Sequence, residues 1–113
     1  MADYLVDAAP LSAALETFAG ERGWEPYLTA RNLMLALTGE VGELAEIFQW
    51  MSDEEAANLS ADPETFAHLQ EEIADVLFYL VQLARVTGVD LDLASRDKIR
   101  KNARKYPAPS QEA

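Results

Sequence analysis

The sequence predicts an all-α protein with an antiparallel four-helix core. Apolar residues recur at intervals of three and four positions along most of the 113 residues, which is the period of an amphipathic helix. Prolines, glycines and N-capping residues divide this pattern into four long segments. The apolar faces of these segments, rich in Leu, Met and Phe, are extensive for so small a chain. We therefore expect the core to be completed by self-association, either as a dimer or as a tetramer.

Length and composition limit the class of protein. We expect one domain (residues 1–113), with an ordered core over about residues 10–107 and a frayed tail over residues 108–113. No apolar run approaches the ~20 residues that cross a bilayer, and the acidic N-terminus lacks the basic region of a signal peptide. The absence of cysteine excludes disulfides and thiolate metal sites. These features favour a cytoplasmic protein with no membrane partner.

The charge of the chain is acidic overall but unevenly distributed. A formal net charge of −11 argues against general nucleic-acid binding. Six of the nine Lys and Arg residues nevertheless lie between Arg96 and Lys105. In this segment Lys98, Asn102 and Tyr106 recur every four residues and would form a polar row on one helical face. The segment is either a solvated basic helix or a source of positive charge for an anionic ligand.

The first two predicted helices are joined by an aromatic connector. The first helix begins near Pro10, a residue suited to a first helical turn, and ends by Gly23. The second spans about residues 29–50. Between them lie Trp24 and Tyr27, which either cover the core or provide a platform on which a flat ring could stack.

The remaining helices begin at recognisable capping residues. Ser52 begins a capping box for a short extra turn. Asp62 is the predicted N-cap of a third long helix over about residues 63–87. The fourth long helix follows its N-cap Asp90 and ends before Pro107.

Two similar acidic motifs lie within the apolar faces of the second and third long helices. Glu40 and Glu43 form the first motif. Glu72 and Asp75 form the second. The two acids of each motif are three residues apart and therefore point the same way from a helix. Winding at about 100° per residue places Glu40 and Glu72 inside apolar stripes and the other two acids at the margins. An ionised acid in an apolar stripe requires a compensating partner.

If the two helices pack through these stripes, the four carboxylates converge. Two like charges about 4 Å apart repel by roughly 4 kcal/mol at an effective dielectric constant near 20. Carboxylate oxygens without Cys or His suit a hard cation, Mg²⁺ first and Mn²⁺ second. The alternative is that the acids extend into water or pair with Lys and Arg. Matched motifs inside two apolar stripes favour the metal site.

Several other residues lie near the two motifs. Trp50 would either border the acidic cluster or cover the core, and the hydroxyl of Tyr79 is expected to border the site. His68 lies one turn before the second motif, where a surface position is favoured over a ligand role. Gly39 and Gly42 are mid-helix glycines, each less favourable than Ala by up to about 1 kcal/mol. Such glycines usually permit close approach of a facing helix or a ligand.

The paired motifs carry a family resemblance. Glu40-Val-Gly-Glu43 and Glu72-Ile-Ala-Asp75, with 28 residues between them, resemble the ExxE…ExxD signature of MazG-like nucleotide pyrophosphohydrolases, the all-α NTP pyrophosphatases. The match to the dCTP pyrophosphatase branch includes residues 21–24, 31–33 and 48–50 and the Lys98…Asn102…Tyr106-Pro107 row. The resemblance covers about residues 11–107. It implies a four-helix core, association into dimers or tetramers, and Mg²⁺-dependent hydrolysis of a nucleoside triphosphate to the monophosphate and pyrophosphate.

The resemblance also implies roles for individual positions. The metal ligands would be the acids of the two motifs: Glu40, Glu43, Glu72 and Asp75. The residues that serve the phosphates and sugar would be Lys98, Asn102 and Tyr106. The residues that enclose the base would be Trp24, Tyr27, Trp50 and Tyr79, and Asn32 would also bind the substrate. The implied substrate is dCTP or a related or modified pyrimidine dNTP. Where relatives tend to have His, this chain has Leu15 and Leu28, which implies a less polar base pocket.

The implied chemistry follows from the charges. Mg²⁺ held by the four acids would bridge phosphate oxygens and offset their charge. A carboxylate not fully used as a ligand would orient or deprotonate the attacking water. Glu43 is the preferred candidate because it lies at the stripe margin, with Glu40 and Asp75 as alternatives. Lys98 would support the leaving pyrophosphate. The sequence leaves open whether water attacks the α or the β phosphorus.

Two other function classes are weighed against this interpretation. A di-iron or di-manganese carboxylate oxidoreductase uses Glu-x-x-His from two helices, and neither motif has His at that spacing. A non-catalytic helical module that docks partners through its basic fourth helix would explain the uneven charge. It would not explain acids inside apolar stripes.

Overall fold

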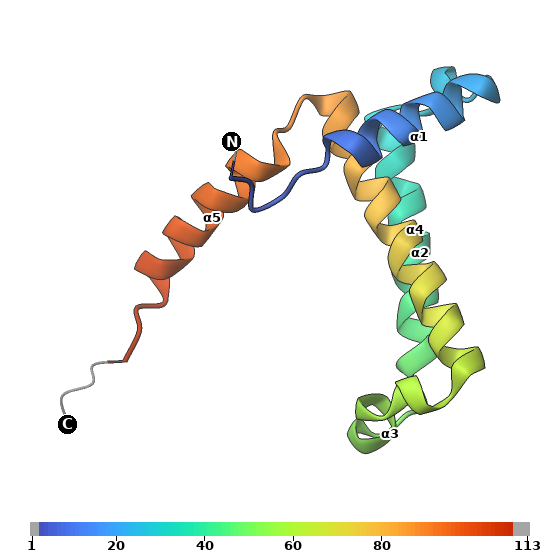
Figure 1. The fold of residues 1–113 in the computed structure, drawn as a ribbon, viewed down its shortest axis with the longest axis vertical. Helices are drawn as coiled ribbons and strands as arrows, with labels where there is room; N and C mark the ends of the chain where they lie inside the picture. The colour runs from blue at the N-terminus through green and yellow to red at the C-terminus, as the bar shows by residue number, and fades with distance from the viewer. Residues whose placement is uncertain (1–2, 110–113) are drawn as a thin grey trace.

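A computed structural model describes residues 3–109 of the chain. It is all-α, as predicted, and has five α-helices and two short 3₁₀ turns over this range (Figure 1). The elements in chain order are α1 (Ala9–Glu21), η1 (Glu25–Tyr27), α2 (Ala30–Phe48), α3 (Asp53–Ala57), η2 (Leu59–Ala61), α4 (Pro63–Thr87) and α5 (Leu91–Lys105). Residues 110–113 of the tail that was expected to fray lie outside the described residues. None of the described helices has the length and apolar character of a transmembrane span.

The predicted helix ends are confirmed because local capping interactions determine them. The Thr29 hydroxyl accepts a hydrogen bond from the backbone N–H of Asn32 and begins α2. Asp62 caps α4 in the same way, and Ser52 forms the predicted capping box of α3. Gly88 ends α4 in the left-handed conformation, with φ of 78°, which a residue with a side chain rarely adopts.

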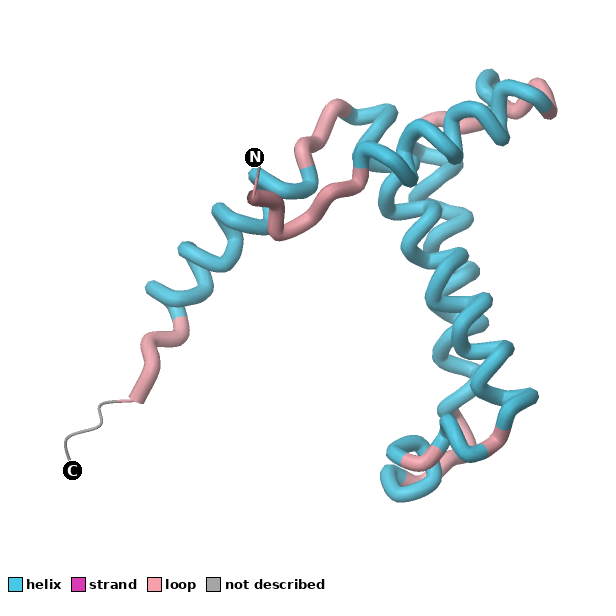
Figure 2. The backbone as a smooth tube through the Cα atoms, viewed as in Figure 1, coloured by secondary structure: helices cyan, strands magenta, loops and turns pink. Residues whose placement is uncertain are grey.

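The main packing unit is the antiparallel pair of α2 and α4, which lie side by side along their length (Figures 1 and 2). Leu33 and Leu37 of α2 are buried. Val81 and Ala84 of α4 are also buried, and they line a cavity together with the N-terminal segment and the start of α1. Helix α1 crosses one end of the pair and packs on α4, where Ala19 is buried. The register of the pair positions the acidic motifs, because each motif lies within the long contact.

Helix α5 extends away from the other long helices (Figure 1). Within one chain the packed helices are therefore α1, α2 and α4, and the fourth long helix makes no extensive contact with them. The N-terminal segment, residues 3–8, lies along the start of α5 instead. The Asp92 carboxylate accepts hydrogen bonds from the backbone N–H groups of Leu5 and Val6 at 2.6 and 3.0 Å. These bonds secure α5 in its extended position.

The chain is extended for its length. The Cα radius of gyration is 17.9 Å, whereas a compact chain of about this length has a value near 13 Å. Large apolar side chains consequently remain exposed on the long helices. On α4, Ile73, Leu77 and Leu80 are about half exposed and lie at intervals of four and three residues, which places them on one face.

Candidate metal centre and adjoining cavity

Three of the four predicted acids converge between α2 and α4. Glu40 and Glu43 project from α2 and Glu72 from α4, and each offers a carboxylate oxygen within 4.8 Å of the other two. The convergence follows from two local facts. Positions three apart share a helical face, and the two helices pack antiparallel through the faces that contain the motifs.

The acids are partly shielded from water and lie close to one another. Glu72 is buried, and one carboxylate oxygen of Glu40 and one of Glu72 have neither a solvent contact nor a hydrogen-bond partner among the described residues. Burial raises the pKa of Glu40 to about 7, and the neighbouring carboxyl groups of Glu72, Glu43 and Asp75 add to the shift. Orphaned buried carboxylate oxygens are costly, and their donor set fits a hard cation such as Mg²⁺.

No Lys or Arg among residues 3–109 forms an ion pair with these acids. The nearest basic side chain is His68, whose Nε2 lies 3.5 Å from Oε1 of Glu72. The His68 side chain is more than half exposed, as expected for a surface position, yet it adjoins the cluster. The alternative in which each acid pairs with its own basic residue therefore receives no support from the described residues.

Asp75, the fourth predicted acid, lies at the edge of this group rather than within it. Its charge raises the pKa of Glu40, and it also contributes to a raised pKa of Tyr79, for which burial is the main cause and Glu40 the second. Both Asp75 and Tyr79 line a neighbouring cavity. The two residues thus connect the acidic cluster to the cavity wall.

The cavity has a volume of about 480 Å³ and lies between α1, the connector and α4. Most of its lining is apolar. The lining residues are Leu11, Ala14, Leu15, Phe18, Ala19, Trp24, Leu28, Leu33, Asp75, Phe78, Tyr79 and Gln82. The lining includes Leu15 and Leu28, the two positions at which relatives tend to have His. A predominantly apolar cavity beside a cluster of carboxylates can enclose a flat ring while the acids hold a cation.

Only some of the aromatic residues predicted to enclose the base line this cavity. Trp24 lines the cavity and packs edge-to-face on Phe18 with ring centroids 5.5 Å apart. Tyr27 and Trp50 do not line it, and their side chains are 70% and 88% exposed. Asn32 is also outside the cavity lining, and its side-chain N–H₂ donates to the backbone carbonyl of Tyr27 at 3.0 Å. The structure therefore brings two predicted aromatics, Trp24 and Tyr79, to the cavity within one chain.

The predicted phosphate and sugar residues lie on α5 and its C-terminal end. Lys98, Asn102 and Tyr106 are exposed, and α5 extends away from the α2–α4 pair (Figure 1). Within one chain they are not brought to the acidic cluster.

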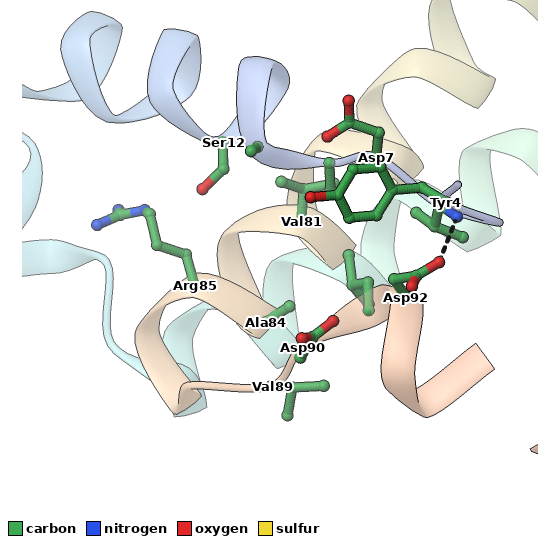
Figure 3. Close-up of a pocket in the computed structure, with 13 residues that line it drawn as sticks. Tyr4, Asp7, Ser12, Val81, Ala84, Arg85, Val89, Asp90 and Asp92 are labelled. Carbon is green, nitrogen blue, oxygen red and sulfur yellow. Dashed lines mark hydrogen bonds between the residues drawn. The ribbon is translucent and has the colours of Figure 1, made fainter. Parts of the chain in front are cut away.

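A second cavity, of about 300 Å³, lies where the N-terminal segment meets α4 and α5 (Figure 3). Its carboxylates belong to Asp7, Asp90 and Asp92, and two of these are already engaged. Asp90 caps α5, and Asp92 binds the N-terminal segment and Arg96. This cavity is structural, since its polar groups fix the position of α5.

The sequence analysis did not single out Gln82, a buried amide on the wall of the larger cavity. A signal for it is present in the sequence. Gln82 is a polar residue inside the apolar stripe of α4, three positions after Tyr79, so the reasoning applied to the buried acids extends to it.

Comparisons with known proteins agree with this geometry. The model of the MazG-like family matches residues 36–113. Human dCTP pyrophosphatase 1 (Homo sapiens) is 55% identical over 91 residues, which cover 80% of this chain and 54% of the human protein. The cattle protein of the same name (Bos taurus) is 53% identical over 90 residues, covering 80% of this chain and 53% of the cattle protein. The chain thus spans about half the length of these curated relatives.

Among solved structures, a pyrophosphatase from Archaeoglobus fulgidus superposes with a TM-score of 0.79 at 39% sequence identity, over 96% of this chain and 99% of the archaeal chain. The family match and this full-length similarity both include the two acidic motifs. The chain therefore belongs to the MazG-like family.

Proposed function

We propose that this protein hydrolyses a nucleoside triphosphate to the monophosphate and pyrophosphate in an Mg²⁺-dependent reaction. The observation that supports this proposal most strongly is the group of three carboxylates within 4.8 Å, two of them with orphaned buried oxygens. Such a group fits a divalent cation, and a divalent cation is the usual partner of a triphosphate. The pyrophosphatase names of the relatives support the same reaction class.

Glu40, Glu43, Glu72 and Asp75 are the proposed metal ligands, with Mn²⁺ as a substitute for Mg²⁺. When bound, the ion would offset phosphate charge and polarise the phosphoryl oxygens. Glu43 is the proposed base that orients or deprotonates water. It is the exposed member of the group, so water reaches its carboxylate, whereas Glu72 is buried. Glu40 and Asp75 are the alternative bases.

The base is proposed to occupy the 480 Å³ cavity, with Trp24 and Tyr79 on its walls. This placement puts the base beside Asp75, so the triphosphate would extend toward the acidic cluster. The proposed substrate is dCTP or a related or modified pyrimidine dNTP, on the basis of the dCTP pyrophosphatase names of the curated relatives. A cytoplasmic location is proposed on the basis of the cysteine-free composition.

The proposed site also requires a second copy of the chain. Lys98, Asn102 and Tyr106 are too far along the extended α5 to serve the acids of their own chain in this conformation (Figure 1). The exposed apolar face of α4 suits association of like chains. In the proposed assembly, α5 of one chain supplies cations to a site that includes the acids of another.

The decisive experiment is a product analysis over all common and modified dNTPs and NTPs with Mg²⁺. We expect a monophosphate and pyrophosphate in equal amounts, and no turnover with a chelator. Reaction in ¹⁸O-labelled water then identifies the attacked phosphorus, because the label enters the monophosphate after attack at the α position and pyrophosphate after attack at the β position. Release of inorganic phosphate alone would contradict the proposal.

A matched pair of variants tests the role of Glu43. Glu43→Gln should retain the helical fold and lose about 10²-fold or more of Mg²⁺-dependent turnover, because an amide neither binds the cation as well nor accepts a proton. Glu46→Gln removes the charge of another exposed acid three residues further along α2 and should retain turnover. Pyrophosphate release at the wild-type rate by Glu43→Gln would refute the assignment.

The alternative, a non-catalytic interaction module, is favoured only by the exposure of the basic α5. Thermal unfolding with Mg²⁺ and nucleotides distinguishes the two. A nucleotide at a hundredfold excess over its Kd would stabilise an enzyme by roughly 2.7 kcal/mol, whereas an adaptor would show little shift.

A further inference from the structure

Gln82 is a buried amide at the wall of the larger cavity. The residue is only 7% exposed, although it lines a space of about 480 Å³. Asp75, Tyr79 and Gln82 lie seven residues or fewer apart on the same face of α4, so they form a polar row along one wall. The row begins at the acidic cluster, which Asp75 adjoins, and ends at Gln82.

Arg85 determines the orientation of the Gln82 side-chain amide. The Nε of Arg85 donates to the Oε1 of Gln82 at 2.8 Å. A guanidinium group has donors only, so the amide atom beside it must be the oxygen. The Nε2 group of Gln82 is therefore directed elsewhere. It has no acceptor among the described residues, and it is not sealed from solvent.

Gln82 is the one residue with a side-chain amide among the residues that line the cavity. Leu15, Leu28 and Leu33 supply apolar surface on the walls formed by α1, the connector and α2. The remaining polar lining residues are Asp75 and Tyr79, which lie toward the acidic cluster, and Trp24, which packs on Phe18.

We propose that the Nε2 group of Gln82 donates a hydrogen bond to a carbonyl oxygen of a pyrimidine base held in this cavity, so that Gln82 favours a base orientation that presents a carbonyl there over one that presents an amino group. The inference rests on the proposed function. A donor-only group pairs with a ring carbonyl, which is an acceptor. A base that turned an exocyclic amino group toward Nε2 would leave donors facing donors, and unpaired buried polar groups are strongly disfavoured. The carbonyl is O2 in cytosine, and O2 or O4 in thymine and uracil.

Arg85 acts in this arrangement as a positioning residue. Besides holding Gln82, its guanidinium lies 3.5 Å from Oε1 of Glu25 in η1, next to the cavity residue Trp24. Arg85 therefore connects the amide on α4 to the connector that forms the opposite part of the wall. In Figure 3 the Arg85 side chain extends away from Asp90 and Asp92, so these acids do not compete for it.

The test compares oxygen and sulfur at the base carbonyl, because sulfur is a weak hydrogen-bond acceptor. The substrates are dCTP, dTTP, their 2-thio forms and 4-thio-dTTP, and the measurement is kcat/KM for pyrophosphate release by the full chain. Wild type should lose roughly tenfold when sulfur replaces the oxygen that Gln82 contacts. The 2-thio and 4-thio arms identify which oxygen that is.

Gln82→Met keeps the length of the side chain and removes its donors. Its kcat/KM on the oxygen substrates should be roughly tenfold below that of wild type, and replacing the oxygen by sulfur should then lower kcat/KM little further. Leu83→Met, on the same helix but outside the cavity lining, is the control and should retain the wild-type ratio of oxygen to sulfur substrates. If sulfur substitution lowers kcat/KM by the same factor in wild type and in Gln82→Met, the loss is due to the larger size of sulfur. That result would overturn the proposal.

The remaining outcomes are also decisive. If Gln82→Met does not fold, wild type alone decides: equal kcat/KM for oxygen and sulfur substrates at both positions overturns the proposal. If wild type releases no pyrophosphate from any nucleotide, the proposed function itself fails. If wild type turns over nucleotides but Gln82→Met behaves identically, only the role of Gln82 fails.

Arg85 has its own readout. Arg85→Met frees the amide of Gln82 to rotate and should lower the ratio of oxygen to sulfur kcat/KM, whereas Arg85→Lys retains a donor for Oε1 and should restore the ratio. A purely structural role would lower the kcat/KM of both substrates by one factor and leave their ratio unchanged, which would overturn the positioning role.

Discussion

Glu40 has features that suit its proposed role as a metal ligand. Its side chain is half-buried, one of its oxygens has no partner, and three other carboxyl groups lie nearby. Burial is the largest cause of its raised pKa, and repulsion by like charges adds to it. Both effects oppose the ionised form of the free protein, and a bound cation reverses both. The same features therefore disfavour the metal-free ionised state and favour the metal-bound one.

The raised pKa of Glu40 predicts a specific pH dependence of stability. The pKa is about 7 in the folded chain and 4.5 ordinarily, so the folded state binds this proton more tightly than the unfolded state. Without metal, ionisation of Glu40 should therefore lower stability progressively as the pH rises from 4.5 to about 7, with the full loss present above it. Glu40→Gln removes this titration.

The measurement is the difference in unfolding free energy between Glu40→Gln and wild type in metal-free buffer from pH 4.5 to 8. The advantage of the variant should grow up to about pH 7 and then remain constant. Saturating Mg²⁺ should reverse the sign of the difference, because the variant lacks a ligand. A difference that does not vary with pH would contradict the assignment of the shift.

At the scale of the element, α2 and α4 form a pair whose ends are set by caps and whose register sets the site. The two mid-helix glycines of α2 were expected to permit close approach of a facing helix or a ligand. A methyl group added at Gly39 or Gly42 would meet no heavy atom within 4 Å, so no facing helix of the same chain approaches there. A ligand or a helix of a neighbouring chain remains as the reason, and the effect on turnover tests the ligand.

Substitution of Gly42 tests this explanation. Gly42→Ala should raise the unfolding free energy by up to about 1 kcal/mol, because Ala is the better helix former and the site has space for it. If a ligand lies against this glycine, the variant should also lower turnover, because the added methyl group would occupy space that the ligand uses. Gly20→Ala in α1, which also has open space, should raise stability without changing turnover. A turnover unaffected by Gly42→Ala would exclude the ligand as the reason for this glycine.

The contact between α5 and the N-terminal segment gives a second prediction at this scale. The backbone hydrogen bonds of Val6 and Leu5 and the Arg96 side chain lower the pKa of Asp92. The segment should therefore be held above the ordinary pKa of Asp and released as the pH falls below the lowered value. Asp92→Ala should release it at neutral pH.

Hydrogen exchange at the amides of Leu5 and Val6 measures this release. Protection should be lost in Asp92→Ala and retained in Asp97→Ala, which removes an acid from the exposed part of α5. Unchanged protection in Asp92→Ala would show that other contacts hold the segment.

At the scale of the whole molecule, the extended shape and the exposed apolar faces belong together. A radius of gyration of 17.9 Å leaves the apolar stripe of Ile73, Leu77 and Leu80 uncovered on the main helix pair. Burying such a face is the main driving force for association. The exposed polar row of α5 would then be available to a neighbouring chain.

The molecular mass in solution tests the proposed association. We expect light scattering to give a multiple of the 12.5 kDa chain mass. Leu77→Glu places a charge in the centre of the stripe and should dissociate the assembly. Ala67→Glu adds the same charge at an exposed position on another face of α4 and should not. Loss of turnover together with dissociation would support a site shared between chains. A monomeric wild type would refute the association.

Local sequence information determined the helices, their caps and the alignment of the acids within each motif. Thr29, Ser52, Asp62 and Asp90 act within three residues of themselves, and the spacing of Glu40 and Glu43 is a property of any helix. For this reason the helix ends and the direction of each acid pair could be predicted without knowledge of the packing.

Only the tertiary structure decided which groups from different helices meet. It places Glu72 against Glu40, encloses a cavity between Leu15 of α1 and Gln82 of α4, leaves Trp50 exposed and extends α5 away from the pair. These outcomes depend on the register and crossing of packed helices, which arise from many weak contacts between residues far apart in sequence. Periodicity along one helix contains no information about which residues of another helix will face it.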